Sequence, residues 1–234
     1  SVLALARRHV YLRTMIKAAF RAAGDLLSPE FRSVLLTAIG LTLALFIIMF
    51  IATEYLVSTM ALFSWPWADQ VLAIGTGLLM LVAFFFLMSP VTAAFAGLFL
   101  DRIAARVENR HYPMDRPGVA LTNAQSIAIT LRFFALVLAV NLMVLPMVFL
   151  GIGVFVLVAV NAYLIGREYF EMAAMRYMPV EDARAFRKEN SVGVFLAGMV
   201  PALLALLPVV NLVVPLFATA YFVHLVKSVR VPSA

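Results

Sequence analysis

The residues best suited to bind a small anion lie at the start of the first long apolar segment, in residues 28–33. Ser28 and Pro29 favour the beginning of a helix, and Arg32 follows within the first turn. That turn presents unpaired backbone N–H groups at the positive end of the helix dipole, and Arg32 adds a charge with directional donors. The segment therefore predicts an anion site. The alternative is that Ser28 caps the helix, Glu30 complements its dipole and Arg32 anchors it in lipid headgroups.

Three asparagines and one arginine form a second group of candidates, because they interrupt long apolar stretches. Asn141, Asn161 and Asn211 carry amides that need hydrogen-bond partners in hydrocarbon. They could line a pore or the mouth of a hairpin, or instead form turns and hydrogen bonds between helices. Arg132, an isolated cation, could line an entry path or extend its side chain to the interface. Arg132, Asn141 and Asn211 are thus our candidates for an ion pathway.

Most other chemistries find no support in the sequence. The chain has no cysteine, which excludes disulfides, thiolate catalysis and Cys-ligated metals, and it has no phosphate-binding loop. His9, His111 and His224 stand isolated in the sequence, so we expect no cluster of histidines and carboxylates and no metal site. The uncharged stretches lack the Asp and Glu residues that proton-coupled pumps use. We therefore expect no catalytic residues, no enzymatic activity and no cofactor.

The composition places most of the chain in lipid. Of 234 residues, 65% are hydrophobic and 13% are charged, against about 25% charged in a soluble domain, and the mean hydropathy is +1.03. A soluble fold of this size cannot bury so much apolar surface. The net charge of +6 is in this setting a signal of membrane topology rather than of nucleic-acid binding. We expect the lipid bilayer as a partner, and no nucleic acid.

The stretches without charge define the elements, and they predict an all-α integral membrane protein. A full span needs about 20 residues to cross roughly 30 Å of hydrocarbon. Two stretches satisfy this. The other two must enter, turn and leave, with arms too short to cross; the first has breaks at Pro146 and 151–153, and the second turns at 208–211. We predict one membrane domain over residues 1–234 with an interfacial amphipathic helix (1–27), two long transmembrane helices (28–58 and 70–110), a hemi-penetrating hairpin (119–166), a cytoplasmic charged helix (167–190) and a second hemi-penetrating hairpin (191–226).

The basic residues set the orientation in the membrane. All 18 lysines and arginines fall in four zones, and none lies between Ser33 and Asp101, where Trp65-Pro66-Trp67 is typical of an interfacial aromatic cluster. The positive-inside rule then places that loop outside and both termini in the cytoplasm. Because two partial hairpins leave one leaflet underfilled, we expect a homo-oligomer. A basic stripe typical of an interfacial helix runs along the N-terminal segment: Arg13, Lys17 and Arg21.

Four short motifs have counterparts in one family of membrane proteins. They are Leu27–Arg32, Ser89-Pro90 followed by 96–100, Pro146–Gly153, and Leu207-Pro208-Val209-Val210-Asn211-Leu212 followed by Pro215 and 218–220. In this order they resemble the CysZ sulfate permease family, part of the etoposide-induced membrane protein superfamily. The likeness runs over nearly the whole chain, and the last motif is its most specific part.

The resemblance implies two long transmembrane helices, two hemi-penetrating hairpins, and sulfate uptake for cysteine biosynthesis across the bacterial inner membrane. In the family, a glycine–leucine–arginine–arginine sequence at the first long helix carries a sulfate site. The matching residues here are Glu30, Phe31, Arg32 and Ser33, so one cation is lost and an acid is gained.

The sequence is consistent with three functions. The first is a sulfate permease or channel-like conduit, and the second is a non-transporting membrane scaffold or partner-binding protein of the same fold. The third is a pore for another small anion. Sulfate entering a negative cell works against about 4.6 kcal/mol per 100 mV, since each charge costs about 2.3. Without a phosphate-binding loop, uptake must then follow downstream consumption of sulfate or coupling to another process.

Overall fold

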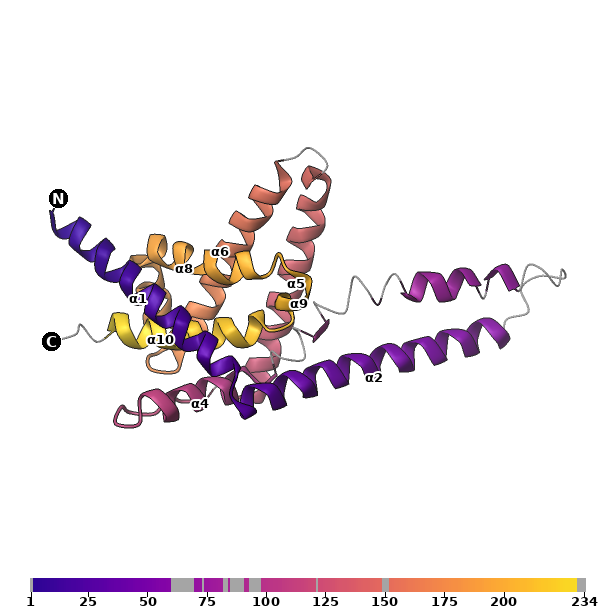
Figure 1. Cartoon of the computed structure of the whole chain (residues 1–234), viewed down its shortest axis with the longest axis horizontal. Helices are drawn as coiled ribbons and strands as arrows, with labels where there is room; N and C mark the ends of the chain where they lie inside the picture. Colours follow the sequence, from indigo (N-terminus) through magenta and orange to yellow (C-terminus); the bar gives the residue numbers. More distant parts are fainter. Residues whose placement is uncertain are drawn as a thin grey trace.

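The computed structural model describes residues 2–59, 70–72, 74–81, 84, 91–92, 98–120, 122–148 and 152–230, and its regular elements there are all helices. The prediction of an all-α protein is therefore confirmed. Figure 1 shows a cluster of helices from which two long arms project. The main helices are α1 (Val2–Leu26), α2 (Pro29–Thr59), α4 (Leu100–His111), α5 (Asn123–Val148), α6 (Gly153–Met175), α7 (Val180–Glu189), α8 (Ser191–Leu204), α9 (Pro208–Asn211) and α10 (Val214–Arg230).

Three of the described helices are long and apolar enough to cross a membrane: Pro29–Leu56, Ile127–Val144 and Gly153–Met175. The first is the predicted long helix. The other two form the first hairpin, for which we expected arms too short to cross, and by length that expectation is wrong. The sequence count took only the uncharged residues between Arg132 and Arg167, whereas the structure places both arginines inside continuous helices. A single arginine does not end a helix, because its side chain can reach the interface.

The first arm pairs α2 with the segment that follows it in the chain (Figure 1). Thr42 and Thr92 are fully buried, and their hydroxyl oxygens lie 2.9 Å apart. Since Thr42 donates its own proton to the carbonyl of Ala38 at 2.8 Å, Thr92 is the donor of the pair. Nearby, the rings of Phe46 and Phe84 meet edge to face with centroids 5.0 Å apart. Hydroxyl pairs of this kind join helices in hydrocarbon, where no water competes.

The returning segment does not run into α4 as a continuous helix. Residues 98 and 99 form a turn, and the amphipathic α4 begins at Leu100. The predicted helix over 70–110 is thus divided at its end, and its remaining course stays a prediction. Other predicted features lie outside the described residues: the loop at 65–67, the bend at 89–90 and the motif residues 96 and 97.

The second hairpin breaks where its proline motif predicted. α8 and α10 have 14 and 17 residues, and the short α9 lies between them at Pro208–Asn211. Both arms are shorter than a full span requires. α10 nevertheless lies at the centre of the fold, where Phe170 of α6 packs against Phe222, and Tyr221 packs edge to face on the same ring.

Two glycines allow α6 and α8 to pack at very short range. A Cβ atom on Gly198 would lie 2.0 Å from the carbonyl oxygen of Ala162, and one on Gly166 would lie 2.5 Å from that of Val194. These distances leave no room for a methyl group, because the obstacle on each side is backbone. Small residues that let two backbones approach are typical of helix pairs in membranes. The crossing therefore fixes the second hairpin on the first.

We predict that Gly198→Ala lowers the midpoint of thermal unfolding in detergent, because the added methyl must push α8 away from α6. Overpacking of this kind costs about 1–3 kcal/mol. Gly40→Ala is the matched control, since a Cβ atom there meets nothing within 4 Å and alanine favours a helix. An unfolding midpoint for Gly198→Ala equal to that of Gly40→Ala would contradict this account of the crossing.

Candidate functional site

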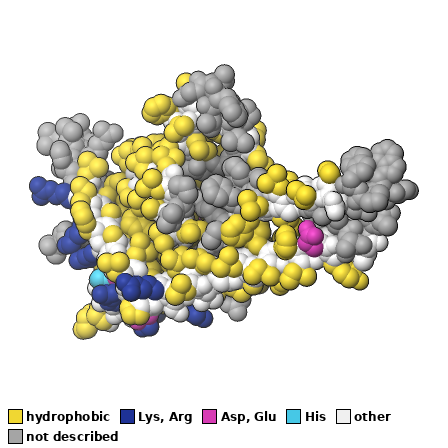
Figure 2. Space-filling model, turned by 45° about the vertical axis from the view of Figure 1, so that its right-hand side comes forward, with side chains coloured by type: hydrophobic (Ala, Val, Ile, Leu, Met, Phe, Trp, Pro, Cys, Tyr) yellow, Lys and Arg dark blue, Asp and Glu magenta, His cyan; other side chains and the backbone are white. Residues whose placement is uncertain are grey.

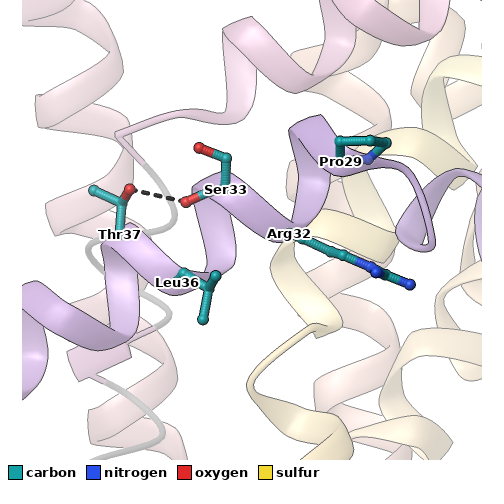
Figure 3. A pocket seen from close by; sticks show the side chains of 5 residues that line it. All are labelled: Pro29, Arg32, Ser33, Leu36 and Thr37. Atoms are coloured by element: carbon teal, nitrogen blue, oxygen red, sulfur yellow. Dashed lines mark hydrogen bonds between the residues drawn. The ribbon is translucent and has the colours of Figure 1, made fainter.

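An open pocket lies at the start of α2, where the sequence predicted an anion site. Pro29, Arg32, Ser33, Leu36 and Thr37 line it (Figure 3). Their spacing places them on one face of the helix, because residues three and four apart are neighbours. Arg32 and Ser33 are exposed, and Figure 3 shows the guanidinium extending away from Ser33 and Thr37. The pocket thus offers an anion one cation and the hydroxyl group of Ser33, because the hydroxyl of Thr37 donates to the backbone carbonyl of Ser33 at 2.8 Å.

The side chains of the other two predicted sulfate-binding residues do not line the pocket. Phe31 is 2% exposed and its side chain belongs to the core. Glu30 forms an ion pair with Arg106 of α4, with Oε1 and Nη2 3.1 Å apart. The acid that replaces the family's glycine is therefore matched by a cation on another helix. Of the four predicted residues, Arg32 and Ser33 line the pocket. Phe31 packs in the core, and Glu30 pairs with Arg106.

The predicted pathway residues are spread over two further elements. Arg132 is an exposed residue of α5. Asn141 lies in the same helix, and Asn211 ends the short α9, where it is half-buried and its backbone N–H donates to the carbonyl of Leu207 at 2.8 Å. This last contact fits a residue that shapes a turn. A pathway through these three positions stays a prediction.

A buried ion-pair cluster beside α4 was not found by sequence reasoning. Arg176, which is 4% exposed, donates from Nε to Glu108 Oε1 at 2.8 Å and from Nη1 to Asp101 Oδ1 at 2.6 Å. The hydroxyl of Tyr177 and the backbone N–H of Gly118 also donate to Glu108. Burial alone would raise the pKa of Glu108, but these hydrogen bonds and the Arg176 charge hold it below its usual value.

The expectation that the histidines stand isolated is also wrong for two of them. The Nε2 atom of His111 lies 2.8 Å from Asp25 Oδ1, and that of His224 lies 3.2 Å from Asp25 Oδ2. Burial by itself would raise the pKa of Asp25, but the bonds from His224 and His111 lower it overall. The three residues are brought together by folding from positions 86 and 199 residues apart, which no local motif reveals.

A half-buried arginine lies at the end of the first hairpin. The Nε atom of Arg167 is buried and has no hydrogen-bond partner in the part of the chain that the structure describes. Close to it on the same helix, Glu171 accepts hydrogen bonds from Arg184 and Arg187 at 3.0 and 3.1 Å. These pairs join α6 to α7.

Basic side chains gather at one end of the face that Figure 2 shows. Figure 2 shows Lys and Arg side chains grouped there beside a histidine, while hydrophobic side chains cover much of the remaining described surface of that face. Exposed large hydrophobic residues occur along α2, including Ile47, Ile48 and Ile51 at about 60% exposure. Such a surface is stable in lipid and not in water. The fold and its charged end therefore define an all-helical membrane protein.

Comparison with known families makes this class more specific. The sequence pattern of the family described as "Sulfate transporter CysZ/Etoposide-induced protein 2.4" matches residues 18–215. The chain therefore belongs to this family, as its motifs indicated. A search of curated proteins gave no match. The family is of a transporter type, which suggests an anion as substrate and a lipid setting.

Proposed function

We propose that this protein is a channel-like conduit that imports sulfate across the bacterial inner membrane for cysteine biosynthesis. The observation that supports this most directly is the open pocket of Arg32, Ser33 and Thr37 at the start of α2, in a chain of the sulfate transporter family. Arg32 is exposed there, and its neighbouring acid, Glu30, is paired with Arg106. Arg32 is therefore available to a dianion.

The position of Arg32 determines which step it serves. No basic residue occurs in the sequence between Ser33 and Asp101, so an anion crossing beside α2 meets no further cation from that helix or the returning segment. Deeper in the membrane the anion must rely on backbone amides, hydroxyls and asparagines. The charge-assisted step accordingly belongs at the rim, with Arg132 on α5 as the second candidate cation.

The driving force in this proposal lies outside the protein. An inside-negative potential opposes sulfate entry by about 4.6 kcal/mol per 100 mV, and the sequence has no phosphate-binding loop to supply it from ATP. The conduit therefore lets sulfate follow its electrochemical gradient, which consumption in the cell maintains. A non-transporting scaffold of the same fold, or a pore for another small anion, are the competing functions.

We further propose an orientation and an assembly. Both termini lie in the cytoplasm, the second hairpin enters the bilayer only in part, and protomers associate to cover its short arms. Single cysteines at Ser64 and Ser233 in this cysteine-free chain are expected to react with impermeant reagents from opposite faces. Reaction of both from the same face would contradict the orientation.

The proposed assembly is tested by the oligomeric state of the purified protein. A stable monomer in several mild detergents would contradict the assembly.

Substitutions at the start of α2 test the site. A hydrogen bond to a charged group contributes about 1.5–3 kcal/mol, so Arg32→Ala is expected to weaken sulfate binding roughly 10- to 150-fold. Arg32→Lys should recover part of this loss, because the charge returns without the planar fork. Glu30→Gly should strengthen binding by removing a like charge. The measurement is a sulfate titration of the purified variants at fixed ionic strength.

An exposed arginine away from the pocket supplies the control for that titration. Arg116 lies in the loop between α4 and α5, so Arg116→Ala removes the same charge without altering the pocket and should leave the affinity unchanged. Equal affinities for Arg32→Ala and the unmodified protein would rule out the helix-start site and direct the search to Arg132.

A further inference from the structure

Three helices meet at a group of metal-binding side chains at the charged end of the molecule. Asp25 comes from the end of α1, His111 from the end of α4 and His224 from α10. Their candidate ligand atoms all lie within 4.8 Å of one another. The two imidazole rings are 4.8 Å apart at their centroids and stand at 73°, so they are not stacked. Each presents Nε2 to a different oxygen of the same carboxylate.

The burial of the group differs from one side to the other. The side chains of Asp25 and His224 are 3% and 1% exposed, whereas that of His111 is 24% exposed. The group is therefore closed on the side of α1 and α10 and reaches solvent on the side of α4. The side of His111 is therefore the side from which an ion and a water molecule would approach.

We propose that Asp25, His111 and His224 bind one divalent first-row transition metal ion, and that zinc is the ion they suit best. Two imidazoles and a carboxylate are ligands that zinc accepts, while calcium and magnesium prefer oxygen ligands alone. With zinc–ligand bonds of about 2.0–2.2 Å in a tetrahedron, neighbouring ligand atoms lie roughly 3.3–3.5 Å apart.

The observed distances are close to what such a site needs. The two nitrogen–oxygen distances, 2.8 and 3.2 Å, run to different oxygens of Asp25, so an ion held by one of these oxygens needs a small rotation of the carboxylate to bring both imidazoles to the tetrahedral edge. In the metal-free protein both Nε2 atoms carry protons and donate to Asp25. When the ion binds, each imidazole releases its Nε2 proton to solvent and takes one up at Nδ1, so that the ring stays neutral, and water takes the fourth position on the exposed side of His111.

Tyr112 supports the proposed ligand atom of His224. Its hydroxyl lies 2.9 Å from Nδ1, on the other side of the imidazole ring from Asp25. With a metal on Nε2, the Nδ1 atom carries the proton and donates it to the tyrosine oxygen. A metal-bound histidine almost always donates its second ring N–H in this way, which fixes its tautomer and ring orientation.

Nearby cations limit the affinity of the site. Arg110 lies with Nη1 3.5 Å from Asp25 Oδ1, and its side chain is 55% exposed, so it can turn away toward solvent when an ion binds. The ammonium group of Lys227 lies over the ring of Tyr112 and is held by Asp115 at 3.0 Å. The bound ion would tie the end of α1, four residues before Pro29, to α4 and α10. Neither the site nor its test depends on sulfate transport.

The test is a cobalt titration of tag-free protein in detergent after treatment with a chelator. Co²⁺ reports its coordination by visible absorption, and added Zn²⁺ should displace it. We expect one Co²⁺ per chain in the unmodified protein, and an affinity at least about 100-fold lower in His111→Gln and His224→Gln, because loss of an outer partner alone costs 10- to 100-fold. Zn²⁺ should also raise the thermal unfolding midpoint of the unmodified protein.

The third histidine provides the control, since His9→Gln removes the one remaining imidazole of the chain and should leave the titration unchanged. His111→Gln is the more informative ligand variant, because its partly exposed side chain contributes least to packing. The proposal is overturned if the unmodified protein shows neither a cobalt spectrum nor stabilisation by zinc. It is equally overturned if His111→Gln and His224→Gln bind Co²⁺ as tightly as the unmodified protein does.

Discussion

The structure depends on the ion pairs that neutralise the buried guanidinium group of Arg176. Arg176 follows α6 directly, and its side chain is 3% exposed, so its charge must be paired within the protein. Glu108 and Asp101 supply two carboxylates from a single helix, α4, and hold it against the end of α6. Loss of one partner from such a group leaves a buried charge and typically costs about 3–5 kcal/mol. Since charges of this kind are costly in hydrocarbon, we expect α4 to lie at the rim of the membrane.

Ion pairs at this end of the molecule also hold the start of α2. α1 is joined to α4 and α10 through Asp25, and Glu30 at the start of α2 is joined to α4 through Arg106. α2 therefore leaves the rim at a fixed point with Arg32 exposed beside it. On the other side, the close crossing at Gly166 and Gly198 holds the second hairpin on the first. The position of the candidate anion site therefore depends on these contacts between helices, although its own residues all belong to α2.

Much of the fold could be predicted because it follows from local patterns. Charge-free stretches, prolines and the amphipathic stripe of α1 are properties of neighbouring residues, and they gave the helix class and the break at Pro208–Asn211. The length of the first hairpin was misjudged because Arg132 and Arg167 were taken as boundaries. Within the candidate site, Arg32 could be predicted from its place in the first turn, whereas the burial of Phe31 depends on which face of α2 meets the core. The pairing of His224 with Asp25 joins residues 199 positions apart, and only folding brings them together.

The central claim is that this chain by itself conducts sulfate down its electrochemical gradient. The most direct test is the uptake of radiolabelled sulfate into liposomes that contain only the purified protein, with a potassium diffusion potential of either sign. The account predicts uptake without ATP, faster with the interior positive and slower with it negative, since two charges cross the membrane. Uptake no faster than in protein-free liposomes at either potential, by protein that remains folded, would contradict it.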